Sequence, residues 1–310
     1  MVSNRKYFNY YMLLSLSFIL GCTFTLLLLH ANTLKLNTSP GRPNYRVLVI
    51  VISAFENHDK RIAIRETWAQ TKENIRVLFI LSKNQHNISL KNMLENEKSI
   101  YNDILEVNVP ETYNSLSIKL LEALKHIDNL DFQYLLKCDD DSFVDLTGIV
   151  QELNKLPKKK LYWGYFNGIA NVKKSGKWKE SEWILCDKYL PYALGGGYVI
   201  SKDLVSYIIK NQNYLSLFIS EDVTVGAWLA PLNITRKHDR RFDTEFKSRG
   251  CNNKYLITHK QSPGVMRLYW SRIQNTGKMC ENEYKKFNSY EYNWTVLPSK
   301  CCLRNSILSP

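Results

Sequence analysis

Three consecutive carboxylates, Asp139, Asp140 and Asp141, follow the short apolar run Phe132 to Leu136. An apolar run of this length bounded by polar residues indicates a buried strand. Ligands of open α/β sheets bind beyond the carboxyl ends of such strands. Adjacent carboxylates repel one another, and a hard divalent cation with oxygen ligands is their natural partner. The triplet therefore indicates a metal site, and the alternative is a solvated acidic turn.

A second acidic pair, Glu221-Asp222, begins a predicted helix that ends near Leu229. Acidic residues at a helix start suit its dipole, so capping is the ordinary explanation. The functional alternative is a carboxylate general base. Two histidines downstream, His238 and His259, are candidate imidazole ligands, although neither has the spacing of a zinc motif.

Two further groups of residues could contact a ligand. Arg61 and Arg65 lie close together on one face of a predicted helix, which is either a solvated face or an anion contact. Three glycines, Gly195, Gly196 and Gly197, permit backbone shapes that are closed to other residues, and the alternative is a plain tight turn.

Strands are predicted to alternate with helices along most of the chain. The predicted strands are 46–52, 76–81, 103–109, 132–136 and 163–166, and the predicted helices are 61–68, 90–98, 115–127, 201–210 and 223–229. This alternation predicts an α/β fold with an at least partly parallel sheet. The sequence has no G-x-G-x-x-G and no P-loop motif, so nucleotide binding would have to use a metal ion.

The 310 residues carry a net charge of +13 and are 45% hydrophobic, enough for one large domain or two small ones. The basic residues are dispersed, and no zinc-finger, RRM or basic-helix motif is present. Nucleic acid is therefore disfavoured as a partner.

The amino end predicts a membrane anchor. Arg5 and Lys6 precede an uncharged stretch whose most apolar part, 8–29, is long enough to cross a bilayer as a helix. Positive charge before the apolar stretch predicts a cytoplasmic amino end. We expect a cytoplasmic tail at 1–6, a transmembrane signal anchor at 7–30, a stem at 31–44 and a lumenal domain at 45–310. The alternative is a cleaved signal peptide, which leads to the same compartment.

Two features agree with a lumenal domain. Asn-x-Ser/Thr glycosylation sequons occur at Asn37, Asn87, Asn233 and Asn293. Outside the predicted anchor the sequence has an even number of cysteines, Cys138, Cys186, Cys251, Cys280, Cys301 and Cys302, which indicates disulfides in an oxidising compartment. The sequence does not choose among the pairings.

Five segments, in order, resemble one family. They are Arg61-Ile-Ala-Ile-Arg-Glu-Thr-Trp68, Glu111-Thr-Tyr-Asn-Ser-Leu-Ser-Ile-Lys119, Lys137-Cys-Asp-Asp-Asp-Ser-Phe143, Gly195-Gly-Gly-Tyr-Val-Ile-Ser201 and Glu221-Asp-Val223. Together they are similar to the β-1,3-galactosyltransferases of the Golgi, inverting and metal-dependent enzymes with the GT-A fold. The resemblance extends from about Arg46 to Trp270. It implies a Golgi membrane protein with a single-pass type II anchor.

Within the family, the segments from Ser220 to Ser262 are most similar to the branch that builds the glycosaminoglycan linkage region. That branch implies UDP-galactose as donor. The implied acceptor is the galactose of galactosyl-β-1,4-xylosyl-serine on a proteoglycan core protein. The alternatives are transfer of another sugar, such as N-acetylglucosamine, and an inactive membrane-anchored homologue. A calcium-binding adhesion module is disfavoured because no EF-hand spacing is present.

The resemblance also implies roles for individual residues. Asp141 would ligate Mn²⁺, with His259 as the preferred additional ligand and His238 as the second choice. Asp222 would be the catalytic base. The implied nucleotide-sugar contacts are Arg61, Arg65, Lys119, Asp139, Asp140, Gly195, Gly196, Gly197 and Glu221.

Overall fold

The computed structural model describes residues 12, 16–27, 44–70, 74–83, 88–176 and 178–304. The chain forms two units, Met1–Pro43 and Asn44–Pro310. In the first unit, residues 16–27 are helical. The tail at 1–6 and much of the predicted anchor at 7–30 lie outside the described residues. Among the residues that are described, no helix has both the length and the apolar character needed to cross a membrane.

The second unit is built on a seven-stranded mixed sheet with the order β3-β2-β1-β4-β7-β6-β8. Its strands are β1 (Asn44–Ile52), β2 (Ile75–Ser82), β3 (Ile104–Val107), β4 (Asp131–Asp139), β6 (Leu161–Asn167), β7 (Tyr192–Ser201) and β8 (Thr235–His238). The first four are parallel, and β7 runs antiparallel to both of its neighbours, β4 and β6. The predicted α/β fold with a partly parallel sheet is confirmed.

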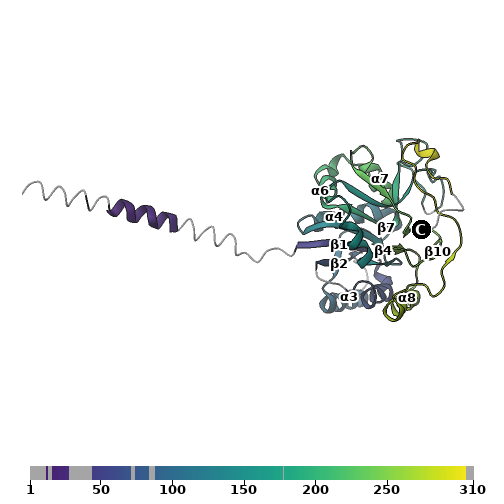
Figure 1. Ribbon diagram of the computed structural model, residues 1–310, viewed down its shortest axis with the longest axis horizontal. Helices are drawn as coiled ribbons and strands as arrows, with labels where there is room; N and C mark the ends of the chain where they lie inside the picture. Colours follow the sequence, from purple (N-terminus) through teal and green to yellow (C-terminus); the bar gives the residue numbers. More distant parts are fainter. Residues whose placement is uncertain are drawn as a thin grey trace, which may run out of the picture. The chain divides into compact units, whose positions relative to one another are not determined.

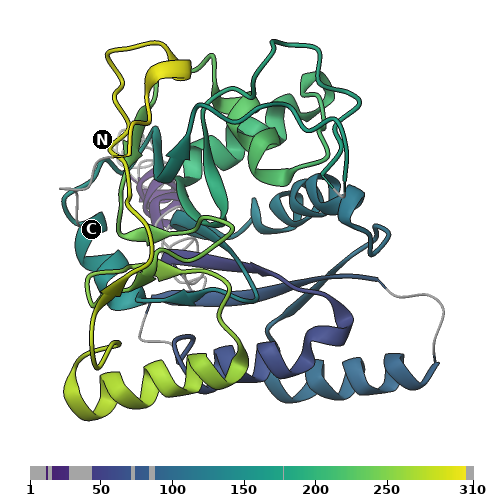
Figure 2. The same ribbon diagram turned by 90° about the vertical axis from the view of Figure 1, so that its right-hand side faces the viewer.

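Helices cover both faces of this sheet. They are α2 (His58–Glu66), α3 (Ile88–Tyr101), α4 (Leu116–Ile127), α5 (Leu146–Leu153), α6 (Lys202–Asn211), α7 (Glu221–Leu229) and α8 (Pro263–Thr276). Figure 1 and Figure 2 place α3 and α8 on one side of the sheet, and α4, α6 and α7 on the other. One face of α4 is apolar and buried, including Leu120, Leu124 and Ile127.

Short elements complete the unit beyond the carboxyl end of β4. A three-stranded sheet has the order β5 (Phe143–Val144), β11 (Ile257–Thr258) and β9 (Phe242–Asp243), and β10 (Gly250–Cys251) pairs with β12 (Tyr284–Lys285). Within the described ranges, the connections contain the 3₁₀ helices η1 (Phe55–Asn57), η2 (Tyr113–Ser115), η3 (Gln212–Tyr214) and η4 (Pro298–Lys300).

The cysteines form two disulfides, Cys251–Cys280 and Cys301–Cys302. Cys138 and Cys186 are free, so the expectation of disulfides is right for only four of the six cysteines. Cys138 is buried within β4, whereas Cys186 is exposed in a loop. Of the four sequons, Asn37 and Asn87 lie outside the described residues, and Asn233 and Asn293 are exposed.

A buried ion pair joins α2 to α3. Arg61 is 1% exposed and donates through Nε and Nη2 to the two carboxylate oxygens of Glu97, at 2.8 and 2.7 Å. Arg65 reaches both Glu97 and Asp103. Burial disfavours the charged carboxylate, but these arginines outweigh it and lower the pKa of Glu97. Removing one partner would leave buried charge without its full compensation.

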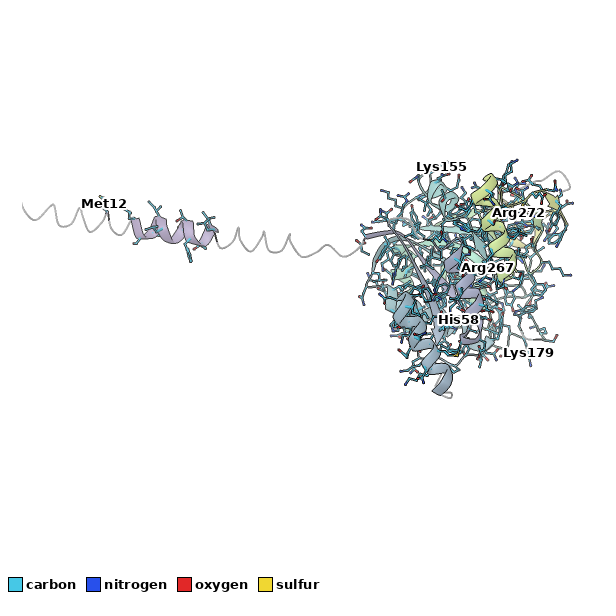
Figure 3. All side chains as sticks on the ribbon, turned by 90° about the horizontal axis from the view of Figure 1, so that it is seen from below. Met12, His58, Lys155, Lys179, Arg267 and Arg272 are labelled. Atoms are coloured by element: carbon cyan, nitrogen blue, oxygen red, sulfur yellow. A yellow bond between two sulfur atoms is a disulfide. The ribbon has the colours of Figure 1, made fainter. Side chains whose placement is uncertain are left out.

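We therefore expect Arg61→Met to lower the free energy of unfolding by about 3 kcal/mol, the range for breaking a buried ion pair. Chemical denaturation of the purified protein measures this. The matched control is Arg272→Ala, which removes the exposed pair with Glu281 near the end of α8 (Figure 3). That change should cost less than about 1 kcal/mol. Equal losses in the two variants would contradict the assignment of Arg61 to the core.

Candidate active site

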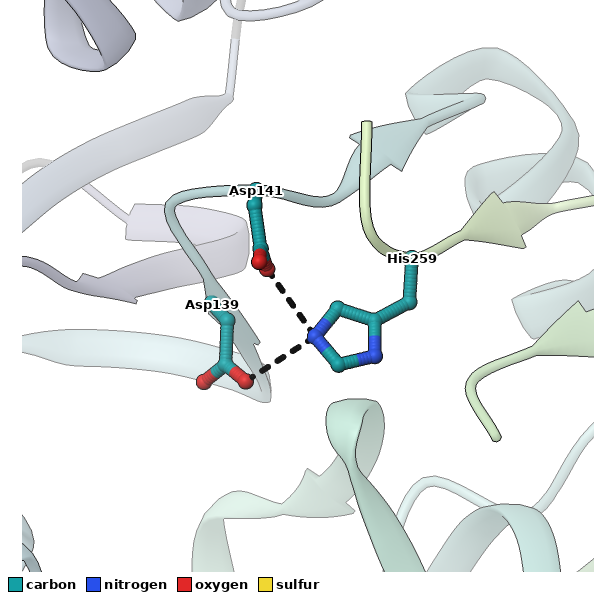
Figure 4. Close-up of side chains that lie close together, drawn as sticks. All are labelled: Asp139, Asp141 and His259. Carbon is teal, nitrogen blue, oxygen red and sulfur yellow. Dashed lines mark ion pairs between the residues drawn. The ribbon is translucent and has the colours of Figure 1, made fainter. Parts of the chain in front are cut away.

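The acidic triplet lies at the carboxyl end of β4, and its side chains diverge. Asp140 is buried and accepts hydrogen bonds from Ser53 Oγ, Asn57 Nδ2 and Lys60 Nζ at 2.8 to 2.9 Å. Asp139 and Asp141 instead converge on one side chain (Figure 4). The triplet therefore divides into one structural carboxylate and two that face a shared site.

That shared side chain is His259, which follows directly after β11. Strand β11 pairs with β5, the strand just after the acidic turn, so that Thr258 lies opposite Phe143. This pairing places His259 Nε2 at 2.9 Å from Asp141 Oδ1 and 3.3 Å from Asp139 Oδ2. Burial disfavours the imidazolium, but the two carboxylates outweigh it and raise the pKa of His259 to about 9.

His238, the second-choice ligand, lies elsewhere in the structure. It is buried, its Nδ1 accepts the Phe166 N–H at 3.1 Å, and its Nε2 lies 2.9 Å from the Tyr290 carbonyl oxygen. Burial lowers the pKa of His238 to about 4. Both ring nitrogens are engaged by backbone, so His238 has a structural role and His259 is the candidate ligand.

The cluster of Asp139, Asp141 and His259 has the geometry of a cation site. One potential ligand atom from each residue can be chosen such that all three lie within 4.8 Å of one another. His259 Nε2 and Asp141 Oδ1 are buried 2.9 Å apart, and neither makes a hydrogen bond. Buried polar atoms normally have a partner, and converging atoms without one fit a metal ion. Two carboxylates and one imidazole suit a divalent cation of the manganese type.

Across from this cluster lies Asp222, at the start of α7. Its Oδ2 accepts the Gly195 N–H at 2.9 Å, and its Oδ1 accepts the Val223 N–H. Burial and the neighbouring Glu221 raise the pKa of Asp222 to about 6, although Lys137 and the two N–H groups act in the opposite direction. A carboxylate whose pKa lies near the working pH is suited to accept a proton from a substrate.

One cavity of about 520 Å³ is lined both by Asp139 and His259 of the cation cluster and by Asp222. Its size is that of a small-molecule or cofactor site. Of the predicted site residues, its walls include Asp139, Gly195, Gly196, Glu221, Asp222 and His259. Asp141 is not among the wall residues, but it contacts two of them, His259 and Lys260.

The cavity walls do not include the other predicted nucleotide contacts, Arg61, Arg65, Lys119, Asp140 and Gly197. Both arginines are held in the ion pairs between α2 and α3. Lys119 is 1% exposed and donates to Glu111 and to the Ser53 carbonyl oxygen. The charges of Arg61, Arg65 and Lys119 are compensated by carboxylates within the protein. These three side chains therefore stabilise the fold.

The structure differs from the sequence-based expectation for the glycine run Gly195 to Gly197. It lies within β7 and is not a tight turn, and no member of the run has positive φ. A Cβ at Gly196 would lie 2.7 Å from His259 Cγ, and one at Gly195 would lie 3.2 Å from Asp222 Oδ2. At Gly197 it would lie 2.6 Å from the Ile257 side chain. The run therefore provides space for the functional side chains and not backbone freedom.

Sequence reasoning missed several residues of the cavity wall. They are Tyr113, Lys137, Lys173, Trp178, Phe246 and Lys260. Lys137 and Lys260 adjoin residues that were predicted, so nearness in sequence was an available signal. Trp178 and Phe246 are far apart in sequence, yet their rings meet edge to face at 5.5 Å, which no sequence pattern indicated.

An α/β sheet with a carboxylate–imidazole cluster and a tuned aspartate in one cavity at its strand ends defines an enzyme active site. Comparison with known proteins identifies which enzymes are related. The galactosyltransferase family model matches residues 59–240. Mouse β-1,3-galactosyltransferase 6 is 42% identical over 266 residues, which cover 83% of this chain and 82% of the mouse protein. The chain therefore belongs to the β-1,3-galactosyltransferase family and is a hexosyltransferase.

Other relatives are more distant. Arabidopsis thaliana hydroxyproline O-galactosyltransferase GALT5 is 32% identical and covers 76% of this chain, but the match spans only 36% of that protein. Xenopus laevis UDP-GalNAc:beta-1,3-N-acetylgalactosaminyltransferase 2 is also 32% identical, over 62% of this chain and 39% of its own length. The chain thus spans little more than a third of these two relatives.

Because a methyl group at Gly196 would collide with His259, we expect Gly196→Ala to weaken Mn²⁺ binding by at least about tenfold, as changes around metal ligands do. Calorimetric titration of the purified protein with Mn²⁺ measures this. The control is Gly264→Ala in α8, where an added Cβ would meet nothing within 4 Å. Unchanged Mn²⁺ affinity in a folded Gly196→Ala variant would mean that His259 is not a ligand.

Proposed function

We propose that this protein transfers galactose from UDP-galactose, in β-1,3 linkage and with inversion, to the galactose of galactosyl-β-1,4-xylosyl-serine on proteoglycan core proteins. The observation that carries the proposal is the shared cavity, whose walls bring Asp139 and His259 opposite Asp222. The identity with mouse β-1,3-galactosyltransferase 6 supports the sugar and the linkage. The linkage-region acceptor rests on the resemblance of the segments from Ser220 to Ser262.

Inversion needs one base and one in-line displacement. Asp222 accepts the proton of the acceptor 3-hydroxyl while that oxygen attacks the anomeric carbon of the donor. The new carbon–oxygen bond forms as the bond from the anomeric carbon to the diphosphate breaks, and UDP departs with the electron pair. No covalent enzyme intermediate is required, so a single tuned carboxylate suffices.

The proposed cofactor is Mn²⁺, which Asp141 and His259 would hold, as the resemblance implies. Asp139, expected as a nucleotide-sugar contact, joins them in the same cluster and would be a third ligand. When bound, a divalent ion supplies Lewis-acid stabilisation of the charge on the departing diphosphate. An imidazole must be deprotonated to bind a metal ion, so His259 would give up its proton on binding. At Asp139, Lys137 and His259 outweigh burial and lower the pKa of the carboxyl, and His259 does the same at Asp141. Both side chains are therefore ionised at neutral pH.

The cellular setting is also part of the proposal. We infer the GT-A fold, the Golgi membrane and a type II signal anchor at 7–30, with the catalytic unit in the lumen. The exposed sequons Asn233 and Asn293 and the two disulfides are compatible with a lumenal location.

A panel of donors and acceptors tests the substrates. With galactosyl-xyloside as acceptor, we expect UDP-galactose to give a β-1,3-linked product at least about tenfold faster than UDP-GlcNAc or UDP-GalNAc, because differential transition-state contacts discriminate sugars. Product linkage is read by NMR. Preference for UDP-GalNAc, the donor in the name of the Xenopus relative, would replace the galactose assignment. No turnover with any donor in the presence of Mn²⁺ would favour the inactive homologue.

Asp222→Asn should reduce turnover by about 10²–10⁴-fold, the usual contribution of a positioned base, while UDP binding is kept. Wild-type kcat/KM should also fall by about tenfold per pH unit as the pH drops below about 6, because a base with a pKa of about 6 is protonated there.

The matched control for Asp222→Asn is Asp203→Asn, since Asp203 also lies in the first turn of a helix, α6, but outside the cavity. Its turnover and pH profile should match those of the wild type. Retained turnover in Asp222→Asn, or an acid limb unchanged in that variant, would remove Asp222 from the role of base.

A further inference from the structure

One buried lysine stands between the two halves of the active site. Lys137 lies on β4 two residues before Asp139, between Ile50 on β1 and Tyr198 on β7. Its side chain is only 3% exposed. An ammonium group this deeply buried is costly unless its charge and its three donors are all satisfied.

The three donors of Lys137 Nζ meet three acceptors that belong to the active site. They are Asp139 Oδ1 at 2.9 Å, Glu221 Oε2 at 2.7 Å and the Gly195 carbonyl oxygen at 2.7 Å. Each acceptor comes from a different element, the end of β4, the start of α7 and the middle of β7. Lys137 therefore bonds to β4, which carries Asp139, to α7, which carries Asp222, and to β7 between them.

Each of these contacts fixes a functional group. Because Asp139 Oδ1 is held by Lys137, its other oxygen, Oδ2, is the one that faces His259 at 3.3 Å. Gly195, held through its carbonyl oxygen, donates its N–H to Asp222 Oδ2. Glu221, the neighbour of Asp222, is held at its other oxygen by the Tyr198 hydroxyl.

A second buried lysine shows that burial alone does not create this arrangement. Lys119 is buried as well, at 1% exposed, and it also bonds a carboxylate and a carbonyl oxygen, those of Glu111 and Ser53. Neither Glu111 nor Ser53 is part of the cavity wall. All three partners of Lys137, by contrast, are cavity residues.

We propose that Lys137 is a positioning residue that couples the metal cluster to the catalytic base: it orients Asp139 toward the cation site and fixes Gly195, and through it Asp222, on the opposite wall. This inference rests on the proposed active site, but not on which sugar is transferred or to which acceptor. It predicts that loss of one side chain impairs two functions at once, binding of the metal and turnover of bound substrate.

The test replaces Lys137 with methionine, which has a similar shape but no charge and no donor. With Asp139 free to rotate, Mn²⁺ affinity in the presence of UDP should fall by about 10- to 100-fold, as it does when partners of metal ligands are lost. Calorimetry measures this without any turnover. At saturating Mn²⁺ and donor, kcat should still be about 100-fold below wild type, because the base is displaced.

The matched control is Lys202→Met. Lys202 on α6 likewise bonds a carboxylate and a carbonyl oxygen, both of Asp128, but lies away from the cavity. Its Mn²⁺ affinity and kcat should equal those of the wild type. If Lys137→Met proves unfolded, Lys137→Arg keeps the charge, but its planar guanidinium does not direct three donors to one point. A folded Lys137→Arg variant should then bind Mn²⁺ about tenfold more weakly.

The double variant Lys137→Met/Glu221→Gln separates positioning from simple charge neutralisation. If Lys137 only compensates Glu221, removing both charges restores Mn²⁺ affinity, and that result would overturn the proposal. If it positions Asp139 and Gly195, affinity stays at least about tenfold low. Wild-type Mn²⁺ affinity in a folded Lys137→Met or Lys137→Arg variant would overturn it as well. If the enzyme prefers a donor other than UDP-galactose, the proposed substrate is wrong, but the effect of the Lys137 variants on Mn²⁺ affinity still tests the role of Lys137.

Discussion

The structure depends on how negative charge is distributed where β4 ends. Three successive carboxylates cannot share one environment without cost, and the fold gives each a different cationic partner. Asp139 meets Lys137, Asp140 meets Lys60, and Asp141 meets Lys260. Only Asp139 and Asp141 also converge on His259. The fold therefore separates the three side chains: Asp140 supports the structure, whereas Asp139 and Asp141 form the candidate cation site with His259.

The same cavity holds carboxylates whose pKa values move in opposite directions. The pKa of Asp139 falls because Lys137 and His259 outweigh its burial. The pKa of Asp222 rises because burial is reinforced by Glu221 and only partly opposed by Lys137. When the environment pushes the pKa values of two carboxyl groups in one site apart, the two groups are suited to different chemical roles. Here one side of the cavity holds permanent charge and the other side can accept a proton.

Close packing between β7 and its neighbours makes this arrangement possible. The three glycines of β7 face Asp222, His259 and Ile257, and side chains at these positions would occupy the space that these three residues need. The strand also contributes backbone groups, since the Gly195 N–H holds Asp222 and the Gly196 carbonyl oxygen accepts from Ser142. The glycines of this antiparallel strand therefore leave room for side chains on both walls, while Tyr192 and Leu194 of the same strand line the cavity themselves.

The sequence by itself determined the α/β class and indicated a site at the end of β4, because apolar runs, helical periodicity and adjacent carboxylates are local patterns. The candidate base, Asp222, came from the family resemblance, since its position at a helix start is also explained by capping. The resemblance of five short segments also indicated the family. Tertiary structure alone decided that His259 and not His238 joins the carboxylates, because the pairing of β11 with β5 is a contact between segments more than a hundred residues apart. It also decided that Arg61 and Arg65 belong to the core, since their partners Glu97 and Asp103 lie on or just after another helix. Local patterns fix what a residue type can do, but its partners in space fix what it does.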